Sequence, residues 1–282
     1  MGLKRYLCAL FAGAAGLLAS SCSSISQPNA GAAPSGHHGN DMYGLGVPQS
    51  DIDAAAENAA HGTPLHPSNS LAGKVLVIVD PGHGMILDNG PELGCHLNGH
   101  MEYRMVNPIA AQFGKNMHQQ GNAVAFTRRT DGQLFDLEAR FHRKFTWGQS
   151  LKLRTDFACA LVTQTGASYA FFIASHINEC SENLDAHGSI AFSYTPQSTE
   201  LRDYIAQACP LNGKPAQRKR EGFLVLTSQL PSVLYEAGFI TNKPDLAEML
   251  RDPGSIADQM SRGALNYIHH RNSGGGVQYA LR

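Results

Sequence analysis

The fold is decided by residues 74–84, which read KVLVIVDPGHG. Residues 74–79 form a continuous apolar, β-branched run, which is typical of a strand covered on both faces. The run ends on Asp80 and a Pro-Gly-His-Gly turn, whose glycines let the backbone bend and leave the His83 imidazole accessible. In an open α/β sheet, side chains at the carboxyl ends of strands meet in one crevice. The stretch therefore predicts a central strand that delivers His83 to a functional site.

Strand-like runs alternate with helical patterns along the rest of the domain. The strand-like runs lie at residues 123–127, 169–174, 189–194, 222–226 and 232–235, and the helical patterns at 106–120, 151–165, 199–208 and 256–269. Such alternation indicates a parallel sheet with helices on its faces. We expect an α/β fold with three α/β/α layers and a mainly parallel, roughly six-stranded twisted sheet.

The chain divides into a leader, a tether, a folded domain and a tail. Residues 1–22 carry Lys4 and Arg5, then an apolar run and small residues, which indicates an export signal peptide. Residues 23–70 are rich in Ser, Ala, Gly, Pro and Asn and are predicted to be a flexible tether, with a short helix possible at 51–60. The folded domain is expected over residues 71–271 and a disordered tail over 272–282.

The end of the leader has two interpretations. Residues 19–22 read ASSC and resemble a bacterial lipobox, in which the cysteine is lipidated and becomes the new N-terminus. An ordinary signal peptidase could read the same small residues and release a soluble protein. With a lipid on Cys22, we expect a periplasmic protein anchored to the outer membrane. No later segment reaches the roughly 20 apolar residues of a membrane span.

Composition limits the partners and the disulfides. The formal net charge is -1, so no long-range field favours nucleic acid. Once Cys8 leaves with the leader and Cys22 carries lipid, Cys95, Cys159, Cys180 and Cys209 remain, and they permit three pairings. Small unpaired thiols are the alternative, particularly for Cys159 and Cys209 in apolar helical patterns.

Two later strand-like runs also end on residues that can bind a metal or transfer a proton. His176 follows residues 169–174, and Glu236 ends the run at 232–235. A single histidine after a strand is more often a surface or capping residue, but a Glu that ends an apolar strand is unfavourable to bury unpaired. The two histidines, His83 and His176, with one carboxylate from the intervening segment and Glu236 as a spare Glu, would make a hydrolytic zinc site.

The ordered segments resemble the successive motifs of the zinc-dependent N-acetylmuramoyl-L-alanine amidases of the amidase_3 type. The resemblance extends over essentially the whole folded domain and rests on residues 79–84, Glu102 with the helix that follows, and residues 126–128, 150–154, 175–178, 223–226 and 235–242. It implies hydrolysis of the amide bond between N-acetylmuramic acid and L-alanine in peptidoglycan. The competing interpretation is a non-catalytic, peptidoglycan-binding envelope lipoprotein.

Carried over to this sequence, the resemblance implies that His83, Glu102 and His176 bind zinc and that Glu236 is the catalytic acid/base. Two neutral imidazoles and one carboxylate leave Zn²⁺ a net positive charge and an open position for water, whose pKa then falls to about 7. Glu236 as a fourth ligand would close that position, so its expected role is to move the proton of the water.

The third ligand has alternatives in the sequence. In relatives the metal-binding Glu lies four residues before an Asn, whereas Glu102 precedes the corresponding Asn by five. His100 could replace or supplement Glu102, and Glu92 and His96 are further candidates. Cys95, His96 and His100 could also hold a metal of their own.

Basic residues outside this set have structural and functional interpretations. Arg128 and Arg154 match the family pattern, and we expect them to form ion pairs within the domain. Residues 133–149 look like an insertion that could contact acidic stem peptides or sugar rings, or be a solvated amphipathic turn. Its basic and aromatic residues include Arg140, His142, Arg143, Lys144 and Trp147.

Overall fold

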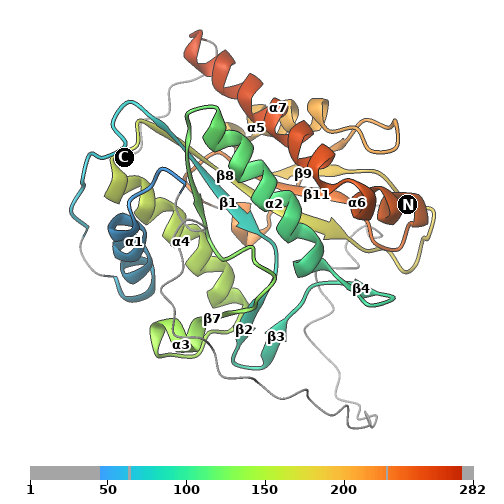
Figure 1. Ribbon diagram of the computed structural model, residues 1–282, viewed down its shortest axis with the longest axis horizontal. Coiled ribbons are helices and arrows are strands. Elements are labelled where there is room, and N and C mark those ends of the chain that lie inside the picture. The colour runs from blue at the N-terminus through green and yellow to red at the C-terminus, as the bar shows by residue number, and fades with distance from the viewer. Residues whose placement is uncertain (1–44, 63–64, 227, 275–282) are drawn as a thin grey trace.

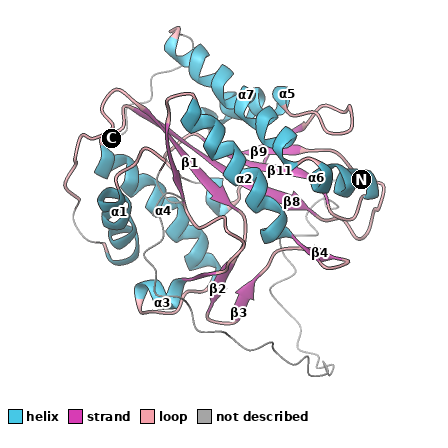
Figure 2. Cartoon of the chain, viewed as in Figure 1, coloured by secondary structure: helices cyan, strands magenta, loops and turns pink. Residues whose placement is uncertain are grey.

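The computed structural model describes residues 45–62, 65–226 and 228–274. At its centre is a six-stranded sheet with the strand order β10-β9-β11-β8-β1-β6 (Figures 1 and 2). Neighbouring strands are parallel, except for the antiparallel pair β9 and β11. The predicted α/β fold with a mainly parallel sheet is confirmed. The strands span Val75–Pro81 (β1), Ala123–Phe126 (β6), Tyr169–Asn178 (β8), Ile190–Ser193 (β9), Gln217–Arg220 (β10) and Ser232–Phe239 (β11).

Helices cover both faces of the sheet (Figure 1). Alternate residues of β1 serve the two layers: Val77 and Val79 pack with one group of helices, and residues 76 and 78 pack with the other. The apolar run at 74–79 therefore reflects burial on both faces. One face carries α2 (Glu102–Gln119), α5 (Pro196–Ala208), α6 (Lys243–Arg251) and α7 (Pro253–Asn272), and the other carries α1 (Gln49–His61) and α4 (Trp147–Thr165).

Two small sheets and a short helix arise from the connections after β1 and β6. Because β1 and β6 are parallel, these connections leave the same edge of the central sheet. One small sheet contains β2 (Met85–Leu87), β3 (Gly90–Glu92) and β7 (Phe135–Asp136); β4 (His96–Leu97) and β5 (His100–Met101) form a hairpin, and α3 (Leu137–Phe141) follows β7.

The prediction of a strand at residues 222–226 is wrong. This segment contains a short 3-10 helix, η2 (Leu224–Leu226), whose Val225 and Leu226 pack in the same core as α4. The sixth strand is instead β10, which contains only polar residues and lies at the edge of the sheet. Charged side chains on an edge strand oppose pairing with other chains. The same polarity removes the apolar signal by which the other strands were predicted.

The predicted helices are all present, but they begin three or four residues before their predicted starts. The predictions followed apolar periodicity, whereas first turns are shaped by capping. Thr146 and Gln149 form a capping box at the start of α4, and α5 and α7 have Pro in their first turn. The earlier start of α2 makes Glu102 its first residue.

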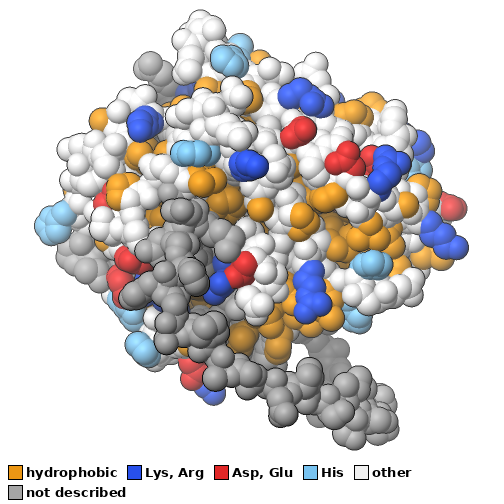
Figure 3. All heavy atoms as spheres, viewed as in Figure 1, with side chains coloured by type: hydrophobic (Ala, Val, Ile, Leu, Met, Phe, Trp, Pro, Cys, Tyr) orange, Lys and Arg blue, Asp and Glu red, His pale blue; other side chains and the backbone are white. Residues whose placement is uncertain are grey.

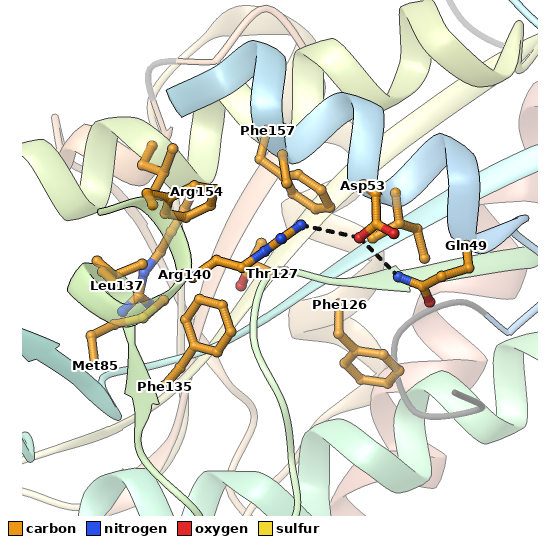
Figure 4. Close-up of a pocket in the computed structure, with 14 residues that line it drawn as sticks. Gln49, Asp53, Met85, Phe126, Thr127, Phe135, Leu137, Arg140, Arg154 and Phe157 are labelled. Carbon is orange, nitrogen blue, oxygen red and sulfur yellow. Dashed lines mark hydrogen bonds and ion pairs between the residues drawn. The ribbon is translucent and has the colours of Figure 1, made fainter. Parts of the chain in front are cut away.

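Helix α1 confirms the short helix considered at 51–60, but it packs against α4 and so corrects the flexible tether predicted around it. Ile52 and Ala55 are buried in the core that the two helices share. Figure 4 shows Arg140 of α3 reaching Asp53 of α1, and the two groups form a 3.1 Å ion pair. A largely apolar cavity of about 230 Å³ lies between α1, α3 and α4 (Figure 4). The packed domain therefore begins before residue 71. The small alanine side chains of α1 allow this helix to lie close to α4.

Cysteines in the described part of the chain are free thiols. Cys180 and Cys209 are buried, while Cys95 and Cys159 are half-buried. The sequence allowed either disulfides or unpaired thiols for these four residues, and in the structure they are unpaired. The thiol of Cys209 is enclosed in the core on the α5 and α7 side of the sheet, where burial raises its pKa to about 12.

The predicted leader and Cys22 lie outside the described residues. Among the residues that are described, no helix is both long and apolar enough to span a membrane. On the face seen in Figure 3, Lys and Arg side chains are interspersed with Asp and Glu and do not form one continuous basic patch.

Substitution of Ala55 tests whether α1 belongs to the packed domain. We expect Ala55→Asp to lower the free energy of unfolding by about 2 kcal/mol or more, because it buries an unpaired carboxylate between α1 and α4. Ala54→Asp, on the half-buried side of the same helix, should change it by less than about 1 kcal/mol. Urea unfolding followed by circular dichroism measures both. Equal stability of the two variants would contradict the packing of α1.

Candidate metal centre

The central strands bring His83, His176 and Glu236 to one edge of the sheet. His83 lies two residues beyond the end of β1, and Pro81 of β1 is in register with Ser175 of β8. In the next pair, His176 of β8 is in register with Glu236 of β11. The parallel direction of β1, β8 and β11 therefore places all three side chains at the carboxyl edge, as expected for an open α/β sheet.

Glu102 bridges the two histidines. Its Oε2 lies 3.1 Å from His83 Nε2, and its Oε1 lies 3.0 Å from His176 Nδ1. The two imidazole rings are 5.0 Å apart between centroids. One nitrogen or oxygen from each of the three residues can be chosen so that all lie within 4.8 Å of one another. His83, Glu102 and His176 thus form a group of donors compact enough to hold a metal ion.

Backbone groups fix the Glu102 carboxylate. Its Oε1 accepts a hydrogen bond from Ile177 N, and its Oε2 accepts one from Cys95 N, both at 3.0 Å. Burial alone would raise the pKa of Glu102, but the charge of His83 and hydrogen bonds from both histidines hold this pKa well below its usual range. The carboxylate is therefore ionised, which is the form that binds metals.

Glu92 lies on the opposite side of His83 from Glu102. Its Oε1 accepts hydrogen bonds from His83 Nδ1 and from Trp147 Nε1, each at 3.0 Å, and its Oε2 lies 3.5 Å from Arg154. Burial opposes the charge of Glu92, but His83 and Arg154 lower its pKa to about 2. Considered in the sequence as an alternative ligand, Glu92 instead orients His83 from behind, as carboxylates commonly do for metal-binding histidines.

The electrostatics around His83 favour a cation. Burial alone would lower its pKa, but Glu102 and Glu92 together raise it to about 10. In the absence of metal a proton satisfies this negative environment. A divalent cation would meet the same attraction and would take the place of the proton on the metal-facing nitrogen.

The other candidate ligands predicted in this region, His96, His100 and Cys95, do not belong to the donor group of His83, Glu102 and His176. His96 and Cys95 line the cavity of the site, whereas His100 lines a separate cavity with residues of α2 and α6. Within the described residues, His83, Glu102 and His176 are the group close enough to hold one ion. The thiol of Cys95 points to Ile177 O at 3.3 Å, and burial raises its pKa well above the usual range.

Glu236 faces the same cavity without joining the donor group. The cavity has a volume of about 220 Å³, and Glu236 lines it with His83, Glu102 and His176. The side chain is buried, and its Oε2 has no hydrogen-bond partner among the described residues. Burial and the charge of Glu102 raise the pKa of Glu236 well above its usual range, while His83 acts in the opposite direction. A buried carboxyl group with a raised pKa beside a group of metal-ligand donors is characteristic of a functional site.

Two buried arginines support the turn that carries His83. Arg154 forms the expected ion pairs, at 3.3 Å with Asp80 and 3.5 Å with Glu92. Arg128 differs from the expectation, because among the described residues no carboxylate pairs with it. It donates instead to the carbonyl oxygens of Pro81 and Gly82, at 2.8 and 2.7 Å. Its position in the motif was evident from the sequence, but its backbone partners were not.

Close packing explains the glycine before His83. A Cβ atom on Gly82 would lie 2.5 Å from Cε1 of His176, a distance that real Cβ atoms do not reach. The missing side chain lets the turn after β1 lie directly against the His176 ring. His83 itself has a φ of +57°, so the turn takes a left-handed conformation to direct its imidazole to Glu102.

A three-layer α/β domain with a His-Glu-His donor group and a nearby free carboxyl is the arrangement expected of a metal-dependent hydrolase. The sequence model of Amidase_3, N-acetylmuramoyl-L-alanine amidase, matches residues 77–266. The chain therefore belongs to the Amidase_3 family, whose enzymes are N-acetylmuramoyl-L-alanine amidases, and its substrate class is peptidoglycan.

Solved structures support the fold. The amidase AmiC2 of Nostoc punctiforme aligns with a TM-score of 0.56 and 22% identity over 70% of this chain and 98% of its own. The catalytic domain of CwlV from Bacillus (Paenibacillus) polymyxa gives 0.54 and 19% over 70% and 98%. The CwlD amidase of Clostridioides difficile, solved in complex with the GerS lipoprotein, gives 0.54 and 21% over 69% and 98%. A search of curated proteins gave no match.

Substitution of Gly82 tests the packing of the donor group. If this donor group holds a metal ion, Gly82→Ala should weaken its binding about tenfold or more, because the new methyl group would displace the His176 ring. Gly148→Ala is the control, since a Cβ there would meet nothing within 4 Å. Zinc retained after dialysis against graded chelator, measured by atomic emission, compares the variants. Equal retention by both would contradict this account of the turn.

Proposed function

We propose that this protein is a zinc-dependent hydrolase that cleaves the amide bond between N-acetylmuramic acid and L-alanine in peptidoglycan. The observation that carries the mechanism is the buried Glu236 carboxyl, which has an unpartnered oxygen beside the His83, Glu102 and His176 group. Membership in the Amidase_3 family supports the choice of substrate bond.

The donor group fits zinc. Two imidazoles and one carboxylate are a common catalytic set for this ion, and they leave a further coordination position open. The Glu92 hydrogen bond to His83 and the two backbone hydrogen bonds to Glu102 supply the outer support that such ligands need. When bound, zinc supplies a Lewis acid that activates water and polarises the amide carbonyl.

Glu236 moves the proton that the reaction requires. As a general base it takes a proton from the attacking water, whose oxygen bonds to the lactyl carbonyl carbon of the muramic acid. The carbon–nitrogen bond then breaks, and Glu236 returns its proton to the departing amine of L-alanine. The products are a lactyl carboxylate on the glycan and a stem peptide with a free amino terminus. The raised pKa of Glu236, caused first by burial, suits a group that must both accept and donate a proton.

We propose that the chain acts in the cell envelope of a Gram-negative cell, on its periplasmic side, with Cys22 carrying a lipid that anchors it to the outer membrane. The charged start, the apolar run and the small residues before Cys22 support this location. Peptidoglycan lies in the same compartment, so a tethered enzyme would reach its substrate from the membrane.

Digestion of purified peptidoglycan tests the reaction and the role of Glu236. We expect the zinc-loaded protein to release free stem peptides and Glu236→Gln to reduce kcat by about 10²- to 10⁴-fold with unchanged zinc content. His176→Ala should lose zinc and activity together. Mass spectrometry detects the peptides and atomic emission the zinc. Loss of zinc in Glu236→Gln would make Glu236 a ligand, and no release by the wild type would favour a non-catalytic wall-binding protein.

Fatty-acid labelling tests the anchor. In cells grown with radiolabelled palmitate, the wild-type protein should carry label in the outer-membrane fraction, because lipid is attached to Cys22. Cys22→Ser should abolish the label, whereas Cys8→Ser should leave it unchanged, since Cys8 lies within the leader. An unlabelled wild-type protein in the soluble periplasmic fraction would instead indicate cleavage by an ordinary signal peptidase.

A further inference from the structure

The only tryptophan of the chain lies next to the metal centre and remains exposed. Trp147 is the first residue of α4, and 43% of its surface is accessible. Its indole nitrogen and the Nδ1 of His83 donate to the same oxygen of Glu92, each at 3.0 Å. The two donor nitrogens, His83 Nδ1 and Trp147 Nε1, are therefore at most about 6 Å apart, because each lies 3.0 Å from the same carboxylate oxygen. Large aromatic side chains with a polar edge held and a face exposed are common in binding surfaces.

The hydrogen bond to Glu92 limits what Trp147 can recognise. The indole nitrogen is its only hydrogen-bond donor, and Glu92 already occupies it. What remains for a ligand is the exposed part of a rigid, apolar ring, since 43% of the surface of Trp147 is accessible. Such a ring complements the C–H face of a pyranose ring, whereas a charged and flexible stem peptide would need hydrogen-bond partners that the ring lacks.

The order of residues across the sheet edge assigns a direction to the substrate. Strands β11, β8 and β1 are consecutive neighbours and carry Glu236, His176 and His83 in that order. Glu92 and Trp147 follow on the side of His83 away from Glu102. The leaving amine must come within hydrogen-bond reach of Glu236 to receive its proton. The peptide therefore departs on the Glu236 side, and the acyl side of the bond, which carries the sugar, extends toward Trp147.

We propose that Trp147 forms a saccharide subsite, on whose indole face the muramic acid ring of the substrate stacks. The subsite rests on the proposed function, because it takes its direction from the bond cleaved and from Glu236 as proton donor. Its contribution is to position the glycan side of the substrate, and Glu92 holds the indole in register with His83.

Intrinsic fluorescence can test the subsite directly, since the chain contains one tryptophan. The zinc-loaded full chain with Glu236→Gln would be titrated with a muramyl-peptide fragment, with a muramic-acid-containing disaccharide lacking peptide, and with the free stem peptide. We expect the first two to change the emission of Trp147 in a saturable manner and the stem peptide to leave it unchanged. No change with the muramyl-peptide fragment, or a response to the stem peptide alone, would overturn the proposal.

Kinetics of Trp147 variants distinguish the contribution of the aromatic ring to substrate binding from that of the indole nitrogen. We expect Trp147→Leu to raise KM for glycan-bearing substrate by about three- to tenfold with little change in kcat, whereas Trp147→Phe keeps a stacking ring, loses only the Glu92 hydrogen bond and should raise KM clearly less. Equal impairment of both would assign the effect to the Glu92 hydrogen bond and overturn the subsite. An unchanged KM in Trp147→Leu would overturn it too.

A matched control is an aromatic residue of the same exposure at the other end of the sheet. Tyr194 is 42% accessible, and it follows β9, which runs antiparallel to β11, so it lies at the edge opposite Glu236. Tyr194→Leu should leave KM unchanged, and a rise equal to that of Trp147→Leu would overturn the proposal. Failure of the wild type to release stem peptides would contradict the proposed function itself, a result that the Trp147 variants cannot produce.

Discussion

The carboxylate of Glu102 is the group on which the arrangement of the metal centre depends. It contacts both histidines and accepts hydrogen bonds from the backbone at Cys95 and Ile177. A carboxylate this deeply buried would be strongly unfavourable without such partners. The four contacts fix three segments: the turn after β1, the loop before β4 and, through two contacts, strand β8. The first residue of α2 therefore joins elements that are far apart in the sequence.

The two other carboxyl groups of the site, Glu92 and Glu236, have pKa values shifted in opposite directions because their surroundings differ. Glu92 contacts His83, Trp147 and Arg154, and its pKa is lowered to about 2 by His83 and Arg154 against the effect of burial. Glu236 has a buried oxygen with no partner among the described residues and a raised pKa. The same residue type is therefore held ionised by its partners on one side of His83 and has a raised pKa, with an oxygen that has no partner among the described residues, on the other.

The sequence predicted those parts of the structure that follow from periodicity and sheet topology. The carboxyl ends of β1, β8 and β11 converge because the strands are parallel, so His83, His176 and Glu236 could be placed together from their positions alone. Glu102 could not be separated from Glu92 or His100 by spacing, because residues 85–101 form short hairpins that no apolar period describes. The polar edge strand β10 and the carbonyl partners of Arg128 were not predicted for the same reason: neither produces an apolar pattern.

The support of Trp147 reaches outside the part of the chain that matches the family. Helix α1 ends before residue 77, where the family match begins. Yet Ala60 of α1 packs in one core cluster with Phe141 and Phe145, and Arg140 of α3 pairs with two acidic residues of α1. Phe145 lies two residues before Trp147, and its carbonyl accepts a hydrogen bond from Asp88 N beside β2. The segment that carries Trp147 is thus held by contacts with α1 on one side and with the residue after β2 on the other. A helix in the predicted tether therefore helps to determine the shape of the site on its Trp147 side, although it contributes no residue to the donor group of His83, Glu102 and His176.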